Sequence, residues 1–227
     1  MDRMNVFNDN NLVHYEGELG IFDYDPEEFK VEKFNDGTEC LHYCGKGNSV
    51  DLPDGCIDTR YMFCQRRLPE GFSLGEHFDT SKVTDMYGMF EGCEILSGFS
   101  LGEHFDTSNV TDMARMFKDC NLPEGFSLGE RFYTSNVTDM ARMFENCKLP
   151  KDFTLGEHFD TSKVTDMCGM FSYCKLPEGF SLGKHFNTSS VTDAKFMFNN
   201  CKYNGIDAYD YFETENDIEI INKLREH

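Results

Sequence analysis

The side chains that could carry chemistry in this chain return at one fixed interval of 27 residues. They are carboxylates and imidazoles, the groups that exchange protons in acid–base catalysis and that bind metal ions. A catalytic pair or a metal site requires such groups at close spacing. The recurring residues are Glu76, Glu103, Glu130 and Glu157; Asp79, Asp106 and Asp160; and His77, His104, His158 and His185.

The repetition itself favours a structural role for these residues over catalysis. A catalytic pair is needed once, whereas a residue that returns in every unit is typical of a scaffold. The aspartate of the recurring Val-Thr-Asp tripeptide, for example Asp85, is expected to cap a helix N-terminus. No Ser-His-Asp constellation, phosphate-binding glycine loop or HExxH motif stands out. We therefore expect a protein that is not an enzyme, with no catalytic residues, no metal and no cofactor.

The ten cysteines indicate packed thiols more than a disulfide framework. Five of them follow the same interval at the end of an apolar stripe, and free cysteine behaves as a small buried hydrophobe. Cys40 and Cys44 are the nearest approach to a metal-ligand pair, and no second pair of that spacing follows. Disulfides between repeats and a metal site remain as alternatives to reduced thiols. The five are Cys93, Cys120, Cys147, Cys174 and Cys201.

A fixed period in this range predicts a solenoid, in which each unit buries its apolar face against its neighbours. In the unit that begins at Leu68, Phe72-Ser73-Leu74 alternates apolar and polar residues and predicts a short strand. Val83 to Cys93 has apolar residues at helical spacing. We therefore expect an α/β solenoid, a leucine-rich-repeat-like stack of 27-residue coils that each pair a strand with a short helix.

The repeat resembles a known family. The strings FDTSKVTDMYGMFEGC and FDTSNVTDMARMFKDC are similar to the BspA-type leucine-rich repeats of bacterial surface proteins. The resemblance covers residues 68–202 and implies a repeat fold without catalytic residues. It also implies a relation to large exported proteins that act in adhesion and in binding to host proteins. Unlike them, this chain is short, and we find neither a signal peptide nor a wall anchor.

Three segments make up the expected organisation. Residues 1–67 are predicted to form a β-rich N-terminal cap that ends in a shortened repeat. Residues 68–202 hold five 27-residue repeats, and residues 203–227 form an acidic C-terminal capping segment with a helix. The strands expected in the first segment are Leu12 to Leu19, Phe29 to Phe34 and Glu39 to Cys44. The final helix is expected after a capping box at Thr214 and Asp217, with Ile218, Ile221 and Leu224 on one face.

The charge balance excludes a nucleic-acid-binding surface. The formal net charge is −20, and no basic stripe interrupts it. Acidity on this scale indicates a basic partner, a cation or solubility. No apolar run reaches the roughly 18 residues of a membrane span, and no secretory signal is evident. We therefore expect a cytoplasmic protein that is a monomer on its own and does not contact a membrane.

Stacking would convert the repeated acids into rows at the strand spacing of about 4.8 Å. The adjacent histidine and arginine row, which includes Arg131, could neutralise them; alternatively, the acidic rows could bind a partner or a metal. The repeats hold a net −8, and five stacked coils would span roughly 24 Å. That is about one charge per 3 Å, near half the density of duplex DNA, which carries about one charge per 1.7 Å. The candidate partner-binding residues are Glu76, Glu103, Glu130, Glu157, Asp79, Asp106 and Asp160.

Three functions follow as hypotheses. The first is a non-enzymatic protein-binding repeat module that acts inside the cell and grips another protein with a basic surface. The second is an acidic, nucleic-acid-mimicking inhibitor of a basic nucleic-acid-binding enzyme, such as a phage-encoded anti-CRISPR or anti-defence protein. The third is an adhesin-like surface repeat protein.

Overall fold

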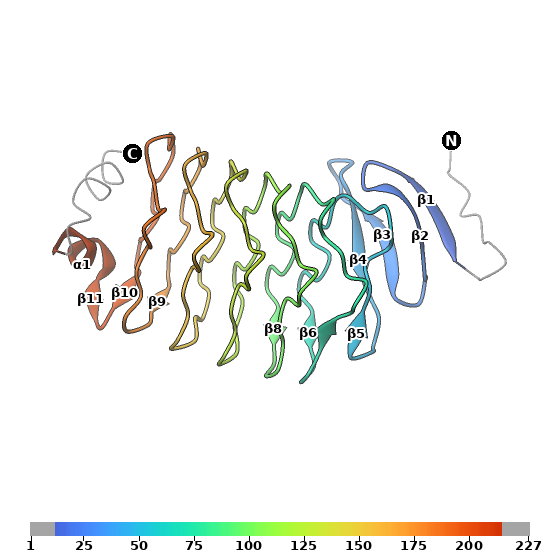
Figure 1. Ribbon diagram of the computed structural model, residues 1–227, viewed down its shortest axis with the longest axis horizontal. Helices are drawn as coiled ribbons and strands as arrows, with labels where there is room; N and C mark the ends of the chain where they lie inside the picture. The colour runs from blue at the N-terminus through green and yellow to red at the C-terminus, as the bar shows by residue number, and fades with distance from the viewer. Residues whose placement is uncertain (1–11, 215–227) are drawn as a thin grey trace.

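Successive 27-residue segments of this chain lie side by side as coils in one elongated row (Figure 1). The structure is a computed structural model and describes residues 12–214. The elements are β1 (Val13–Gly17), β2 (Gly20–Tyr24), β3 (Phe29–Lys33), β4 (Glu39–Tyr43), β5 (Ser49–Val50), β6 (Arg67–Leu68), β7 (Ser73–Leu74), β8 (Glu94–Ile95), β9 (Lys175–Leu176), β10 (Lys202–Tyr203), β11 (Ile206–Asp207) and α1 (Ala208–Thr214).

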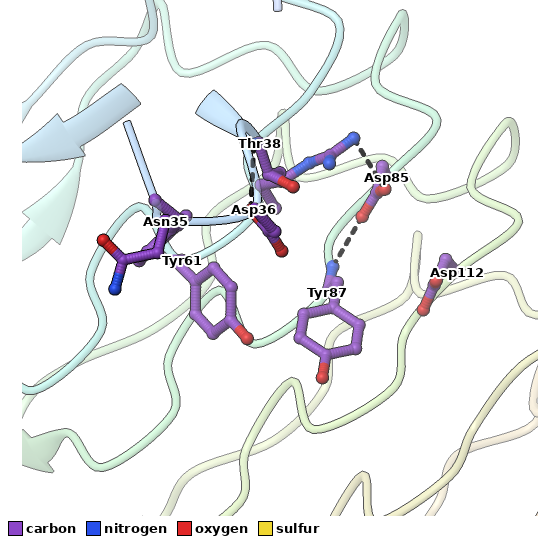
Figure 2. A pocket seen from close by; sticks show the side chains of 9 residues that line it. Asn35, Asp36, Thr38, Tyr61, Asp85, Tyr87 and Asp112 are labelled. Carbon is purple, nitrogen blue, oxygen red and sulfur yellow. Dashed lines mark hydrogen bonds and ion pairs between the residues drawn. The ribbon is translucent and has the colours of Figure 1, made fainter. Parts of the chain in front are cut away.

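Two antiparallel hairpins stand at the N-terminal end of the row. β1 pairs with β2 through a turn at Gly17 and Gly20, and β3 pairs with β4. Strands were expected where β1, β3 and β4 lie, whereas β2 was not anticipated. The turn between β3 and β4 carries Asn35 and Asp36, and it lies beside the first coils (Figure 2).

Parallel ladders join each coil to the next. One ladder pairs β5 with β7 and continues to Ser100. A second ladder pairs β6 with β8 and continues through single bridges to Asn121 and Lys148. At the equivalent positions of the last coils, β9 pairs in parallel with β10. The third joins the aspartates of the Val-Thr-Asp tripeptides and begins at Asp58. Its members are Asp58, Asp85, Asp112, Asp139, Asp166 and Asp193.

The apolar segment from Val83 to Cys93 contains turns at residues 87–92 and differs from the short helix expected there. The Met89 N–H donates to the Met86 carbonyl at 3.1 Å, but the Phe90 N–H donates to Met116 of the next coil at 2.9 Å. Gly88 and Gly92 both have positive φ angles. Because alternate amides bond to the next coil, an i to i−4 helical ladder does not form. Among residues 12–214 the one α-helix is α1.

Phenylalanine rings stack in a continuous ladder through the interior. Neighbouring rings have centroids 5.2–5.7 Å apart and interplanar angles of at most 7°. Phe212 of α1 packs on the last ring, Phe198, at 5.2 Å and so covers that end of the ladder. The single core therefore extends from the hairpins to α1. The ladder consists of Phe63, Phe90, Phe117, Phe144, Phe171 and Phe198.

The polar residues of the repeat also bond between coils. The buried Thr134 hydroxyl donates to the Asp160 carbonyl at 2.8 Å. The Thr138 hydroxyl donates in the opposite direction, to the Thr111 carbonyl at 3.2 Å. The first bond satisfies a buried hydroxyl that would otherwise be costly to bury; the second, at an exposed threonine, joins two adjacent coils. The recurrence of both threonines thus has a structural cause.

All ten cysteines are free thiols. The Cys93 thiol donates to the Phe63 carbonyl of the preceding coil at 2.8 Å, and burial raises its pKa to about 12. Burial also raises the pKa of the Cys120 and Cys147 thiols well above the ordinary value. A thiol held in its protonated form is a poor nucleophile and a poor metal ligand. These cysteines therefore serve the packing of the core.

The C-terminal end is covered by α1, which begins after β11. The Asp207 carboxylate accepts a hydrogen bond from the Tyr209 N–H at 3.2 Å, and Tyr211 stacks on Tyr203 with ring centroids 3.8 Å apart. The final helix was expected to begin after Thr214, but Thr214 is the last residue of α1, which begins at Ala208 because Asp207 bonds to its first turn. Asp217 of the expected capping box and the face with Ile218, Ile221 and Leu224 lie outside the described residues. Within residues 12–214, no helix combines the length and the apolar character needed to cross a bilayer.

Candidate functional site

The seven predicted carboxylates form two neighbouring rows along the coils. Backbone bonds between adjacent coils set this alignment: the Thr80 N–H donates to His104 at 3.3 Å, and the Thr107 N–H donates to Arg131 at 3.2 Å. The same bond recurs from Thr134 to His158. Equivalent side chains of successive coils are thereby held next to one another.

The glutamate row is exposed. Its four members are Glu76, Glu103, Glu130 and Glu157, and we use the name glutamate row for them below. Within the described part of the chain, none of the four has a hydrogen bond or an ion pair. Lys184 occupies the next position and ends the row. Four carboxylates that face solvent without a counter-charge are available to a partner.

The aspartate row has a different environment. Asp79, Asp106 and Asp160 each accept a hydrogen bond at 2.8–2.9 Å from the backbone N–H two residues later. This bond is the main cause that lowers the pKa of Asp79 and of Asp160. Such bonds define Asx turns. The structure therefore gives these three aspartates a local structural task in addition to their charge.

The basic row interacts with the aspartates, and within the described part of the chain it forms no ion pair with the glutamates. Arg131 is 3.7 Å from the Asp106 carboxylate, and the charges of His104 and His185 help to lower the pKa of Asp79 and Asp160. The neutralising role expected for this row therefore applies to the aspartates.

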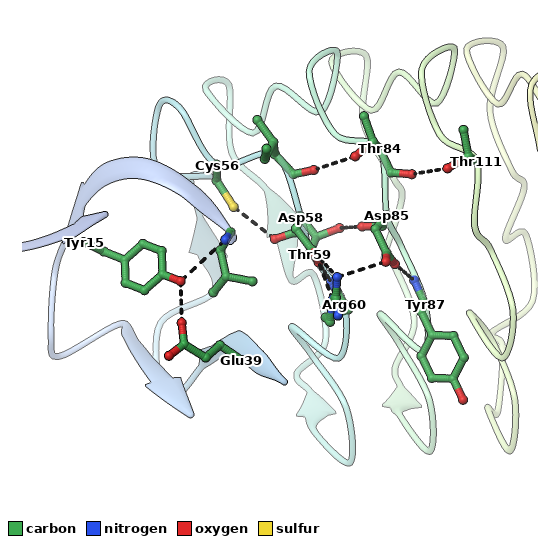
Figure 3. Close-up of polar contacts among 12 residues, drawn as sticks. Tyr15, Glu39, Cys56, Asp58, Thr59, Arg60, Thr84, Asp85, Tyr87 and Thr111 are labelled. Carbon is green, nitrogen blue, oxygen red and sulfur yellow. Dashed lines mark hydrogen bonds and ion pairs between the residues drawn. The ribbon is translucent and has the colours of Figure 1, made fainter. Parts of the chain in front are cut away.

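A third acidic row consists of the Val-Thr-Asp aspartates. Each accepts a hydrogen bond from the N–H two residues later, as Asp112 does from Ala114 at 2.9 Å, so each caps a turn and not a helix. At the N-terminal end Arg60 bridges Asp58 at 2.5 Å and Asp85 at 3.2 Å (Figure 3). Burial, reinforced by the charges of Asp85 and Asp139, raises the pKa of Asp112 to about 6.

A cleft of about 560 Å³ opens where this third row meets the turn between β3 and β4. Figure 2 shows the Tyr61 and Tyr87 rings side by side in it, with Asp85 and Asp112 beyond them. We call it the tyrosine cleft. Its lining residues are Phe34, Asn35, Asp36, Thr38, Arg60, Tyr61, Asp85, Tyr87 and Asp112.

The backbone fixes the position of the Tyr61 ring. Tyr61 has a φ of 55°, in the left-handed region. Its ring lies against Gly88, where an added Cβ would come within 2.7 Å of the ring. The glycine thus makes room for the aromatic side chain on the neighbouring coil.

Sequence reasoning did not identify the tyrosine cleft. One signal was present: Tyr87 stands where the next two coils carry Ala114 and Ala141. A large aromatic residue where the next two coils carry alanine marks a departure from the repeat. Phe34 gave no such signal, because it belongs to a hairpin outside the repeats.

The described residues contain no group of three or more histidine, cysteine, aspartate or glutamate side chains arranged to hold a metal ion. Within this part of the chain, metal binding by the glutamate and histidine rows finds no geometric support. The candidate binding features of the described residues are therefore the exposed carboxylates of the glutamate row and the acidic, aromatic tyrosine cleft.

Comparison with protein families gives a match. A family model described as "Mycoplasma protein of unknown function, DUF285" matches residues 57–153 and again residues 125–223. The two matches together cover most of the chain, including all the coils. No curated protein and no solved structure matches the sequence.

Proposed function

This chain belongs to the DUF285 family of Mycoplasma proteins of unknown function, and we propose that it is a non-enzymatic, protein-binding repeat module that engages a basic partner. The observation that carries the proposal is the glutamate row, four exposed carboxylates without a counter-charge on adjacent coils. Aligned like charges repel one another in the free protein, and a basic surface laid across them would relieve that repulsion.

The proposal includes two finer assignments. The repeats are of the BspA type and form a leucine-rich-repeat-like solenoid, which the ladders between coils and the family match support. The protein acts inside the cell, which its ten free cysteines support because thiols persist in reducing compartments.

The test removes the charge of the glutamate row and keeps its shape. In the full chain Glu76, Glu103, Glu130 and Glu157 are replaced by Gln, and the variant is compared with wild type in pull-downs at low and high salt. A matched control removes four exposed carboxylates elsewhere on the coils, as Glu70→Gln, Glu124→Gln, Asp152→Asn and Glu178→Gln. Exposed ion pairs contribute up to about 1 kcal/mol each, so we expect affinity for the captured partner to fall about tenfold or more.

The outcome separates the candidate functions. Salt-sensitive capture that is lost in the glutamate-row variant and kept in the control supports the proposal. Equal loss in both variants, or loss in neither, contradicts it. If duplex DNA or RNA displaces the captured partner, the module is a nucleic-acid mimic that inhibits a basic enzyme; the repeat segment's net charge of −8 is the observation that favours this second candidate.

A further inference from the structure

The tyrosine cleft combines aromatic rings with two carboxylates, Asp36 and Asp112, that have no ion pair within residues 12–214. We propose that it binds the side chain of an arginine residue on a basic protein partner. This inference rests on the proposed function, because it names the residue type through which such a partner is recognised.

The aromatic wall is a row of three rings. Phe34 contacts Tyr61 edge-on with centroids 5.3 Å apart, and Tyr61 contacts Tyr87 edge-on at 5.2 Å. Phe34 is 40% exposed, so solvent reaches this wall. A guanidinium group is attracted to the face of such rings. The chain already shows the contact, since the Arg115 guanidinium carbon lies 5.6 Å from the centre of the Tyr87 ring.

The carboxylates of the cleft outnumber its cations. Asp36, Asp85 and Asp112 face one arginine, Arg60. Arg60 is engaged with Asp58 and Asp85. Within residues 12–214, no basic side chain lies within ion-pair distance of Asp36 or Asp112. The cleft therefore carries a net charge of −2 and complements a cation.

The Asp112 carboxylate is costly to ionise, mainly because it is buried. It accepts one hydrogen bond, from the Ala114 N–H at 2.9 Å. Burial and the neighbouring Asp85 and Asp139 raise its pKa to about 6. A positive charge beside it would offset both effects, which supports a site that is completed by a cation.

The lining of the cleft favours arginine over lysine. A guanidinium group is planar, so it can stack on a tyrosine ring while its N–H groups donate to a carboxylate. An ammonium group offers a point charge and does not stack. A cleft lined by both aromatic rings and carboxylates therefore fits the guanidinium better.

The experiment is an NMR titration of the full-length chain with N-acetyl-arginine amide. The expected dissociation constant is on the order of 1–10 mM, as for one cation–aromatic contact and one ion pair. The resonances of Tyr61, Tyr87 and Asp112 should shift and saturate. N-acetyl-citrulline amide, which is neutral, should produce no saturable shift, and N-acetyl-lysine amide should bind at least about threefold more weakly.

Two variants locate the site. Asp112→Asn keeps the turn-capping oxygen and should weaken arginine binding about fivefold. Asp166→Asn, which alters the equivalent turn two coils away, should leave binding unchanged. Tyr87→Ala installs the residue found in the next two coils, so the fold tolerates it; it should abolish the preference for arginine over lysine.

The following results would overturn the inference. Citrulline could bind as well as arginine, Asp112→Asn and Asp166→Asn could weaken binding equally, or the shifts could fall on the glutamate row and leave the cleft unaffected. None of these results removes partner capture by the glutamate row, which the pull-down tests separately, so a failure of this inference can be told apart from a failure of the proposed function.

Discussion

The Asp112→Asn substitution should stabilise this protein at neutral pH. In the folded chain the pKa of Asp112 is raised from its ordinary value of 3.8 to about 6, mainly because burial disfavours the charged carboxylate. Between these two values the folded protein binds the proton more tightly than the unfolded chain does. The free energy of unfolding therefore falls as the pH rises from about 4 to about 6. Above pH 6 the carboxylate is ionised in both states, so the folded protein bears the full free-energy cost of a buried charge.

The size of the effect follows from the same values. A pKa difference of about two units corresponds to about 3 kcal/mol. Solvent screening at this partly exposed carboxylate reduces the figure to about 1–2 kcal/mol. Asparagine keeps the oxygen that accepts the hydrogen bond from Ala114, so the turn survives and only the charge is removed.

The assay is urea unfolding followed by tyrosine fluorescence, at pH 7.5 and at pH 4. Asp112→Asn should raise the free energy of unfolding by about 1–2 kcal/mol at pH 7.5, and most of the difference should disappear at pH 4. Asp166→Asn is the control: it makes the same turn, and Lys195 lies near the adjacent Asp193. Its effect should stay within about 0.5 kcal/mol. A destabilised Asp112→Asn, or a gain of equal size at both pH values, would refute the reasoning.

Two further substitutions test the packing. Phe144→Ala removes a fully buried ring that stacks on Phe117 at 5.7 Å and on Phe171 at 5.5 Å; urea unfolding should show a loss of about 3–5 kcal/mol, and a loss below about 1 kcal/mol would contradict the continuous ladder. Gly88→Ala should lower the free energy of unfolding by about 1–2 kcal/mol because of its positive φ, and the added Cβ should also displace the Tyr61 ring. The control is Gly125→Ala, which has a positive φ but nothing within 4 Å of the added Cβ, so it should show only the backbone effect. Equal losses in the two glycine variants, with unchanged Tyr61 resonances, would show that the ring does not depend on Gly88.

The rows of identical side chains could be predicted from the sequence, because a strict 27-residue interval places equivalent residues of neighbouring coils together. The apolar spacing from Val83 to Cys93 suggested a helix, since two successive turns with a left-handed residue repeat apolar positions every three or four residues, as a helix does. The hydrogen bonds distinguish the two, and these depend on the neighbouring coil: the Phe90 amide bonds to Met116.

The glutamate row could be predicted from the sequence in part, and the tyrosine cleft could not. The alignment of the four glutamates follows from the 27-residue interval alone. Their lack of a counter-charge does not, because it depends on the side-chain contact of Arg131, which pairs with Asp106 and not with Glu130. The tyrosine cleft combines Phe34 of a hairpin, Tyr61 of the shortened repeat and Tyr87 of the first full coil. No local pattern joins three residues from such different contexts.

The left-handed turn position that holds Tyr61 has a consequence for how this protein can change. The same position returns in every coil with nearly the same φ, 55–64°, although its occupant differs: Tyr61, Gly88, Arg115, Arg142, Gly169 and Phe196. The backbone there is held by bonds between coils and not by the side chain. One edge of the molecule can therefore acquire new residues, coil by coil, while the interior stays constant. Relatives that share this core could thus diverge in what they recognise without having to evolve a new fold.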